Sequence, residues 1–162
     1  GSNAAYPHHI TSQKKLRSHE MVLIDMGVDY KGYKSDLTRT FFLGKITPLA
    51  RKVYDAVRQA QEAAFRQIEP GVPAGRIDGA ARQYLAQRGY GAFFGHHLGH
   101  GVGLEVHELP GISGGQNNTL MPGMVFTIEP GVYLPGKLGV RIEDMVLVTE
   151  KGARTISGAV NK

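Results

Sequence analysis

The sequence contains no cysteine and no tryptophan among its 162 residues. Without cysteine there is no disulfide framework and no thiolate zinc site, and the absence fits the reducing cytoplasm in which we expect the protein. No apolar run approaches the roughly 20 residues of a membrane-spanning helix, and the first residues lack the charged head and apolar stretch of a secretory signal. We therefore expect no membrane partner.

Residues of one charge sign are also not clustered anywhere in the sequence. The formal net charge is +5, but the basic residues are scattered singly, and no stripe of Lys and Arg alternates with aromatic residues. This pattern argues against a nucleic-acid partner. With 41% hydrophobic residues, the chain has the composition of one ordinary globular domain.

Two apolar, β-branched stretches at 21–30 and 36–43 flank Gly32. Because glycine suits a tight turn, they predict a pair of antiparallel strands joined by a hairpin. Further strands are expected at 124–134 and 139–149, with a short one near 153–157.

Two helices are predicted between these strands. Thr47 caps the first and Pro48 lies in its first turn. Its core face repeats at helical spacing through Leu49, Val53, Val57, Ala60, Ala64 and Ile68. The second helix runs from about residue 76 to 88, with Ile77, Ala81, Tyr84 and Leu85 on one side. Strands, then helices, then strands predict an α+β domain with a mainly antiparallel sheet, against which both helices pack.

Acidic residues stand inside the apolar strand patterns. They are Asp25 in VLIDMG, Asp36 at the start of a strand, Glu129 in VFTIEPG and Glu143 in GVRIEDMV. A buried, unpaired carboxylate costs several kcal/mol. Arg39 and Arg141 could neutralise some of them as buried ion pairs, but four acids exceed these cations. A metal centre supplies the missing positive charge.

The stretch HHLGHGVGLEVHE, residues 96–108, adds four of the seven histidines. Oxygen-rich sites with an imidazole suit Mn²⁺, Co²⁺, Fe²⁺ or Zn²⁺. Two divalent ions would balance four carboxylates, so a dinuclear centre with hydrolase chemistry is the expectation.

Four motifs, DMGVDYKGYKSDLTRTFF, HLGHGVGLEVHE, TIEPGVY and RIEDMVLVT, occur in this order. Together they resemble the metallopeptidases of the pita-bread fold (family M24), and in detail the Xaa-Pro branch, which comprises prolidase (Xaa-Pro dipeptidase) and aminopeptidase P. The resemblance implies a mainly antiparallel, curved sheet with helices packed on its outer face.

The resemblance also implies site residues. The implied metal ligands are Asp25, Asp36, His100, Glu129 and Glu143. Glu129 is in addition the implied proton shuttle, His107 steadies the oxyanion, and His96 lines the proline pocket. The implied substrate contacts are His8, His96, His107 and Arg141. Arg141 is also a candidate for holding Glu143, whereas we interpret His97 as incidental.

The implied reaction is hydrolysis of the peptide bond before proline, with two divalent ions per site. Mn²⁺ is the first expectation, and Co²⁺, Zn²⁺ and Fe²⁺ are alternatives. The substrate is a peptide with proline in second position. The motifs leave dipeptidase and aminopeptidase P open. A methionyl-aminopeptidase-like or creatinase-like hydrolase is the alternative, and a metal-free pita-bread binding module is a further one.

Relatives of this type carry an N-terminal domain and an earlier part of the catalytic domain. Residues 1–162 therefore resemble the C-terminal portion of one catalytic domain. The expected partners are the missing N-terminal segment of the same protein and, because dimers are common among relatives, a second copy in a homodimer. Without the missing segment, we expect unpaired sheet edges and uncovered apolar surface, and a chain that alone is not fully active.

Overall fold

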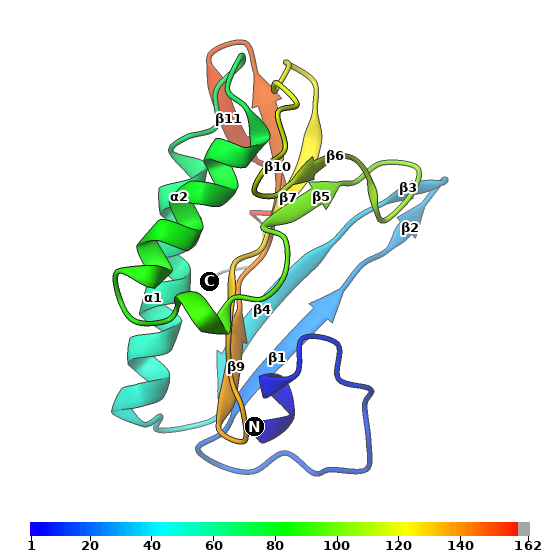
Figure 1. Cartoon of the computed structure of the whole chain (residues 1–162). Coiled ribbons are helices and arrows are strands. Elements are labelled where there is room, and N and C mark those ends of the chain that lie inside the picture. Colours follow the sequence, from blue (N-terminus) through cyan, green and yellow to red (C-terminus); the bar gives the residue numbers. More distant parts are fainter. Residues whose placement is uncertain (159–162) are drawn as a thin grey trace.

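The computed structural model describes residues 1–158 (Figure 1). The strands are β1 (Met21–Met26), β2 (Asp29–Tyr30), β3 (Tyr33–Lys34), β4 (Leu37–Phe42), β5 (Gly99–Gly101), β6 (Glu108–Ile112), β7 (Val125–Ile128), β8 (Gly131–Leu134), β9 (Leu138–Arg141), β10 (Asp144–Thr149) and β11 (Gly152–Thr155). The helices are α1 (Pro48–Phe65) and α2 (Ala74–Ala86), with short 3-10 turns η1 (Ser2–Ala5) and η2 (Gly91–Phe93).

Both predicted helices are present. The Thr47 hydroxyl caps α1 by accepting a hydrogen bond from the Ala50 N–H at 3.1 Å, which satisfies one of the free donors of the first turn. The apolar faces of the two helices are buried as expected, except at two positions. Tyr84 is only partly buried, and Leu49 is 40% exposed.

The predicted antiparallel pair is β1 with β4, where Asp25 faces Thr38. Its far end continues as the small hairpin β2–β3. Lys31 and Gly32 form the tip with positive φ angles of 54° and 86°, the left-handed backbone that a tight hairpin turn requires.

The expected long strands at 124–134 and 139–149 are wrong as continuous elements. Each is broken once, so that β7 pairs with β10 and β8 pairs with β9. Pro130 has no N–H to donate to the ladder. At the break the Glu129 N–H bonds to the Leu98 carbonyl at 2.8 Å, and the Glu143 N–H bonds to the Thr38 carbonyl at 3.1 Å. Both glutamates thus lie where the strands change partners.

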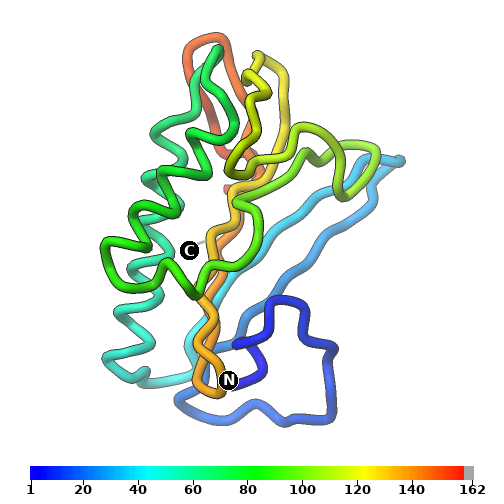
Figure 2. The backbone as a smooth tube through the Cα atoms, in the orientation of Figure 1, coloured from blue at the N-terminus to red at the C-terminus, as the bar shows by residue number. Residues whose placement is uncertain are grey.

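Figures 1 and 2 show the helices side by side along one side of the strands, with β1 and the N-terminal segment on the other side. The largest sheet has the order β11-β10-β7-β5-β6, and all its neighbours are antiparallel. The core lies between the helices and the strands. Within residues 1–158, neither helix has the length and apolar character needed to cross a membrane.

Candidate metal centre

A cleft of about 740 Å³ opens beside the strand breaks. Every site residue singled out from the sequence lines it: His8, Asp25, Asp36, His96, His100, His107, Glu129, Arg141 and Glu143. His97 lines it as well. The fold therefore gathers side chains that lie far apart in the sequence into one cavity.

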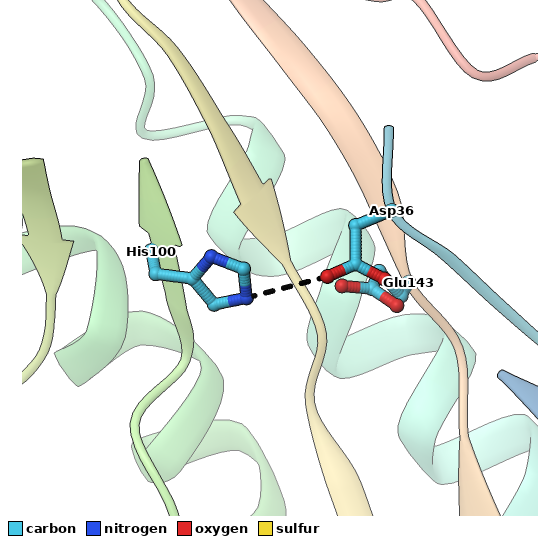
Figure 3. Close-up of side chains that lie close together, drawn as sticks. All are labelled: Asp36, His100 and Glu143. Carbon is cyan, nitrogen blue, oxygen red and sulfur yellow. Dashed lines mark ion pairs between the residues drawn. The ribbon is translucent and has the colours of Figure 1, made fainter. Parts of the chain in front are cut away.

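Asp36, His100 and Glu143 form the centre of this cleft. Each offers one ligand atom, and these atoms all lie within 4.8 Å of one another. Figure 3 shows the three side chains pointing toward each other from separate segments of the chain. The Nε2 atom of His100 is 3.7 Å from an Asp36 oxygen and 3.3 Å from a Glu129 oxygen.

Backbone contacts orient His100. Its Nδ1 lies 3.1 Å from the Gly101 carbonyl, which can only accept, so Nδ1 carries the hydrogen and Nε2 faces the carboxylates. The glycines on either side let neighbouring strands approach closely. A Cβ on Gly99 would lie 1.8 Å from the Thr127 carbonyl oxygen, and one on Gly101 would lie 2.3 Å from the Leu109 carbonyl oxygen.

Two threonine hydroxyls hold the glutamates. Thr38 donates to Glu143 at 2.7 Å. The Thr127 hydroxyl lies 3.3 Å from Glu129 Oε1 and accepts from the His100 N–H at 3.1 Å. The carboxylates are thereby fixed in the cleft before any ligand is considered.

Two expectations for Asp25 and Arg141 need correction. Asp25 is not buried: its side chain is 43% exposed, because β1 pairs only with β4 among the described strands. It forms an ion pair with Arg141 at 2.6 Å, the alternative to a metal role that we considered from the sequence. Arg141 does not contact Glu143 directly; its Nε donates to Thr38 at 3.2 Å, and Thr38 bonds Glu143.

The second interior cation, Arg39, pairs with Asp144 at 2.7 Å. Of the four acids that we placed inside strands, only Glu143 is buried. Asp36 and Glu129 are partly exposed to the cleft.

A chain of hydrogen bonds runs along one wall of the cleft. Arg141 donates to the Tyr133 hydroxyl at 2.9 Å, and that hydroxyl lies 2.9 Å from His96 Nε2. His96 Nδ1 lies 2.7 Å from the His97 carbonyl. Because a carbonyl only accepts, Nδ1 carries the hydrogen and Tyr133 donates to Nε2. Burial lowers the pKa of His96, in agreement with a neutral ring.

The remaining histidines differ in their contacts. The His107 ring lies against His100, with 4.0 Å between ring centroids. His8 is exposed at the rim. The His97 side chain is exposed and makes no hydrogen bond or ion pair within residues 1–158.

Burial and neighbouring charges shift the pKa values of several side chains in the cleft. Burial raises the pKa of Glu143 well above its usual range, and the nearby Glu129 and Asp36 raise it further. Burial and Asp25 likewise raise the pKa of Asp36. Burial alone would lower the pKa of His100, but the carboxylates of Glu129 and Asp36 outweigh it and raise the pKa to about 8.

This donor set fits a divalent cation. Carboxylate oxygens and one imidazole nitrogen converge on a point. Burial first, and the neighbouring carboxylates second, raise the pKa values of Asp36 and Glu143, and a cation would stabilise the buried negative charge.

Sequence reasoning missed Thr38, Thr127 and Tyr133. Side chains two positions apart in a strand point to the same face. Thr38 lies two positions after Asp36, and Thr127 lies two positions before Glu129, so this spacing could have revealed both. Tyr133 lies beyond the break at Pro130, and no such pattern marks it.

Known proteins resemble this chain in both sequence and fold. Residues 1–150 match the model of metallopeptidase family M24. The chain is 45% identical over 157 residues to an uncharacterized peptidase of Staphylococcus aureus (strain USA300) and to the Xaa-Pro dipeptidase of Pyrococcus furiosus. Each comparison covers 97% of this chain but 45% of the relative.

Solved structures of related proteins have a similar fold. The prolidase of Thermococcus sibiricus is 46% identical with a TM-score of 0.97, over 100% of this chain and 44% of that one. An aminopeptidase P variant of Escherichia coli is 31% identical with a TM-score of 0.90, over 100% of this chain and 43% of that one. The chain thus spans less than half the length of these relatives.

Proposed function

The chain belongs to metallopeptidase family M24 and has the pita-bread fold of its solved relatives, and we propose that it carries the metal centre of a peptidase that cleaves the bond before proline. Both the family and the fold agree with what the motifs predicted. Because the chain spans about 45% of its curated relatives, the activity is proposed for the whole protein.

One observation carries the proposal: all nine site residues singled out from the sequence line the same cleft. Three of them already bring ligand atoms within 4.8 Å of each other. Glu129 extends this group through its 3.3 Å contact with His100. Asp25 would complete it as the fifth ligand if it exchanged its Arg141 partner for an ion.

We assign two divalent ions to this centre, on the charge balance of its four carboxylates, with Mn²⁺ as the first choice. When bound, the ions supply Lewis acidity, which polarises a carbonyl group and acidifies water. Glu129 accepts the proton of the attacking water and passes it to the departing nitrogen. His107 donates to the carbonyl oxygen as negative charge develops there.

The substrate side of the site is assigned to His96, His8 and Arg141. A peptide bond before proline is a tertiary amide without an N–H, so a site for it must recognise shape more than hydrogen bonding. The His96 ring packs edge-to-face with the buried Phe94 ring and lies against the buried Tyr133 ring. These contacts hold the His96 ring at the cleft, where it can lie against the apolar proline ring.

Hydrolysis of Xaa-Pro dipeptides and Xaa-Pro tripeptides by the full-length protein with added Mn²⁺ tests the proposal. We expect cleavage before proline in at least one panel. Preference for dipeptides assigns a dipeptidase, and preference for longer peptides assigns an aminopeptidase P. Cleavage of Met-Ala peptides but not of Xaa-Pro peptides would overturn the substrate assignment.

Variants test the metal centre itself. His100→Ala and Glu129→Ala each remove a proposed ligand and should abolish both activity and stoichiometric Mn²⁺ binding. His97→Ala is the matched control, because His97 lines the same cleft without a side-chain partner among the described residues, and it should retain both. Retained activity in His100→Ala and Glu129→Ala would refute the metal centre.

A further inference from the structure

Gln61 is a polar residue in the middle of the apolar face of α1. It is 1% exposed, and its neighbours on that face, Val57, Ala60 and Ala64, are fully buried. A buried amide costs free energy unless it is hydrogen-bonded. The partners of Gln61 therefore indicate why a polar group stands there.

The Gln61 amide nitrogen lies within hydrogen-bonding distance of both strand breaks. It lies 3.1 Å from the carbonyl oxygen of Ile128 and 3.2 Å from that of Ile142. These residues immediately precede Glu129 and Glu143, the two glutamates of the cleft. One helix side chain thus links the two backbone segments that carry them.

The strand ladder connects the two segments on either side of the glutamates but not at the glutamates themselves. Ile128 pairs with Asp144 before the break, and Gly131 pairs with Arg141 after it. Between these pairs, Glu129 and Glu143 direct their N–H groups to Leu98 and Thr38, and the Ile142 N–H to Pro130 carbonyl contact is long, at 3.5 Å. The contacts of Gln61 therefore add a cross-link where the ladder is interrupted.

A buried charged group contacts the same Gln61 amide nitrogen, whose two hydrogens are shared among three acceptors. This nitrogen also lies 3.1 Å from Asp144 Oδ2, and the other Asp144 oxygen pairs with Arg39 at 2.7 Å and accepts from Ser157 at 2.9 Å. Arg39 in turn donates to the carbonyl of Glu143. The helix is thus tied to a rigid cluster directly behind the cleft.

We propose that Gln61 is a positioning residue that fixes the separation of Glu129 and Glu143 by binding the carbonyls in front of them. The proposal rests on the metal centre proposed above. Gln61 is not among the residues that line the cleft, and its contacts with the Ile128 and Ile142 carbonyls reach the glutamates through the backbone. Residues that orient metal ligands in this indirect way typically contribute tenfold to hundredfold in metal affinity.

The test is Co²⁺ titration of the full chain, followed by calorimetry and by the visible absorption of Co²⁺, which responds to coordination geometry. In Gln61→Met, which keeps the length but removes the donors, the Kd for Co²⁺ should rise by about tenfold or more and the absorption bands should change. Gln59→Met is the matched control. Gln59 lies on the same helix, is half-buried and makes no hydrogen bond within residues 1–158, so its Kd and spectrum should match the wild type.

Two negative outcomes are distinguishable. If the wild type binds no Co²⁺, the proposed metal centre fails. If the wild type binds and Gln61→Met has the same Kd and spectrum with only a lower melting temperature, Gln61 is merely structural and the positioning role is overturned. Should Gln61→Met not fold, Gln61→Asn keeps a buried amide but withdraws it by one methylene, and an unchanged Kd in that variant overturns the role equally.

Discussion

At the scale of single residues, protons compete with the proposed cation for the side chains of the cleft. Burial, Glu129 and Asp36 raise the pKa of Glu143, and neighbouring carboxylates raise the pKa of His100 to about 8. Carboxylates and imidazoles bind metals only when deprotonated. Metal binding must therefore displace protons that the folded, metal-free chain holds more tightly than the unfolded chain does.

This competition predicts a pH dependence. Both groups have folded pKa values above their unfolded values of about 4.3 for Glu and 6.5 for His, so the stability they contribute is present at low pH and lost as pH rises through about 8. The melting temperature of the metal-free protein should fall between about pH 6 and 9, while the Kd for Mn²⁺ tightens. Thermal melts in a chelator measure the first effect, and Glu143→Gln should flatten it. A metal-free protein that gains stability over this range would contradict the assignment.

The Tyr133 hydroxyl offers a second prediction at this scale. It joins Arg141 to His96 and bonds no proposed metal ligand. Tyr133→Phe should raise KM for Xaa-Pro peptides about tenfold, which corresponds to about 1.4 kcal/mol, near the low end for a hydrogen bond to a charged group. The Kd for Mn²⁺ should stay at the wild-type value. If KM is unchanged and metal binding is lost, the chain of hydrogen bonds serves the metal and not the substrate.

At the scale of elements, the approach of β5 to its neighbours determines where His100 lies. Gly99 and Gly101 flank it, and both would clash with neighbouring backbone if they carried a Cβ. The glycines therefore serve strand packing around the ligand.

Gly99→Ala tests this packing. Its methyl group would lie 1.8 Å from the Thr127 carbonyl oxygen, so β5 and β7 must separate at a cost of about 1–3 kcal/mol. We expect a lower melting temperature and weaker Mn²⁺ binding. Gly95→Ala is the control, because nothing lies within 4 Å of its added Cβ. Equal stability and affinity in the two variants would show that β5 is not held in place by this contact.

Elements with a local signal were predictable from sequence. Thr47, Pro48 and the spacing of Val53 and Val57 specify α1 without reference to the rest of the chain. The first strand break carries a signal in Pro130 and Gly131. The second break, at 142–143, was not predictable, because no proline or glycine marks it. Only the partners at the break, contributed by Leu98 and Thr38, make the interruption favourable.

At the scale of the whole molecule, four candidate ligands come from separate parts of the chain. Asp36 precedes β4, His100 lies in β5, Glu129 follows β7, and Glu143 precedes β10. Their clustering was predictable through the motifs. The exposure of Asp25 was not, because the pattern VLIDMG reports strand character and not what covers the strand. Its burial depends on what lies against β1, which the local pattern does not contain.

A ligand that bridges these segments should stabilise the entire fold. At a free Mn²⁺ concentration one hundred times its Kd, the expected gain in unfolding free energy is about 2.7 kcal/mol. Thermal melts at increasing Mn²⁺ should show a rising midpoint that a chelator reverses. His100→Ala should remove the dependence. A wild-type midpoint independent of Mn²⁺ would count against a site that exists only in the folded state.

The scattered origin of the cluster also sets an order of events during synthesis. Asp36 and His100 leave the ribosome before Glu143, which directly precedes β10. The nascent protein thus lacks part of the proposed donor set until Glu143 has emerged. The proposed cation site therefore cannot be complete before this segment is synthesised.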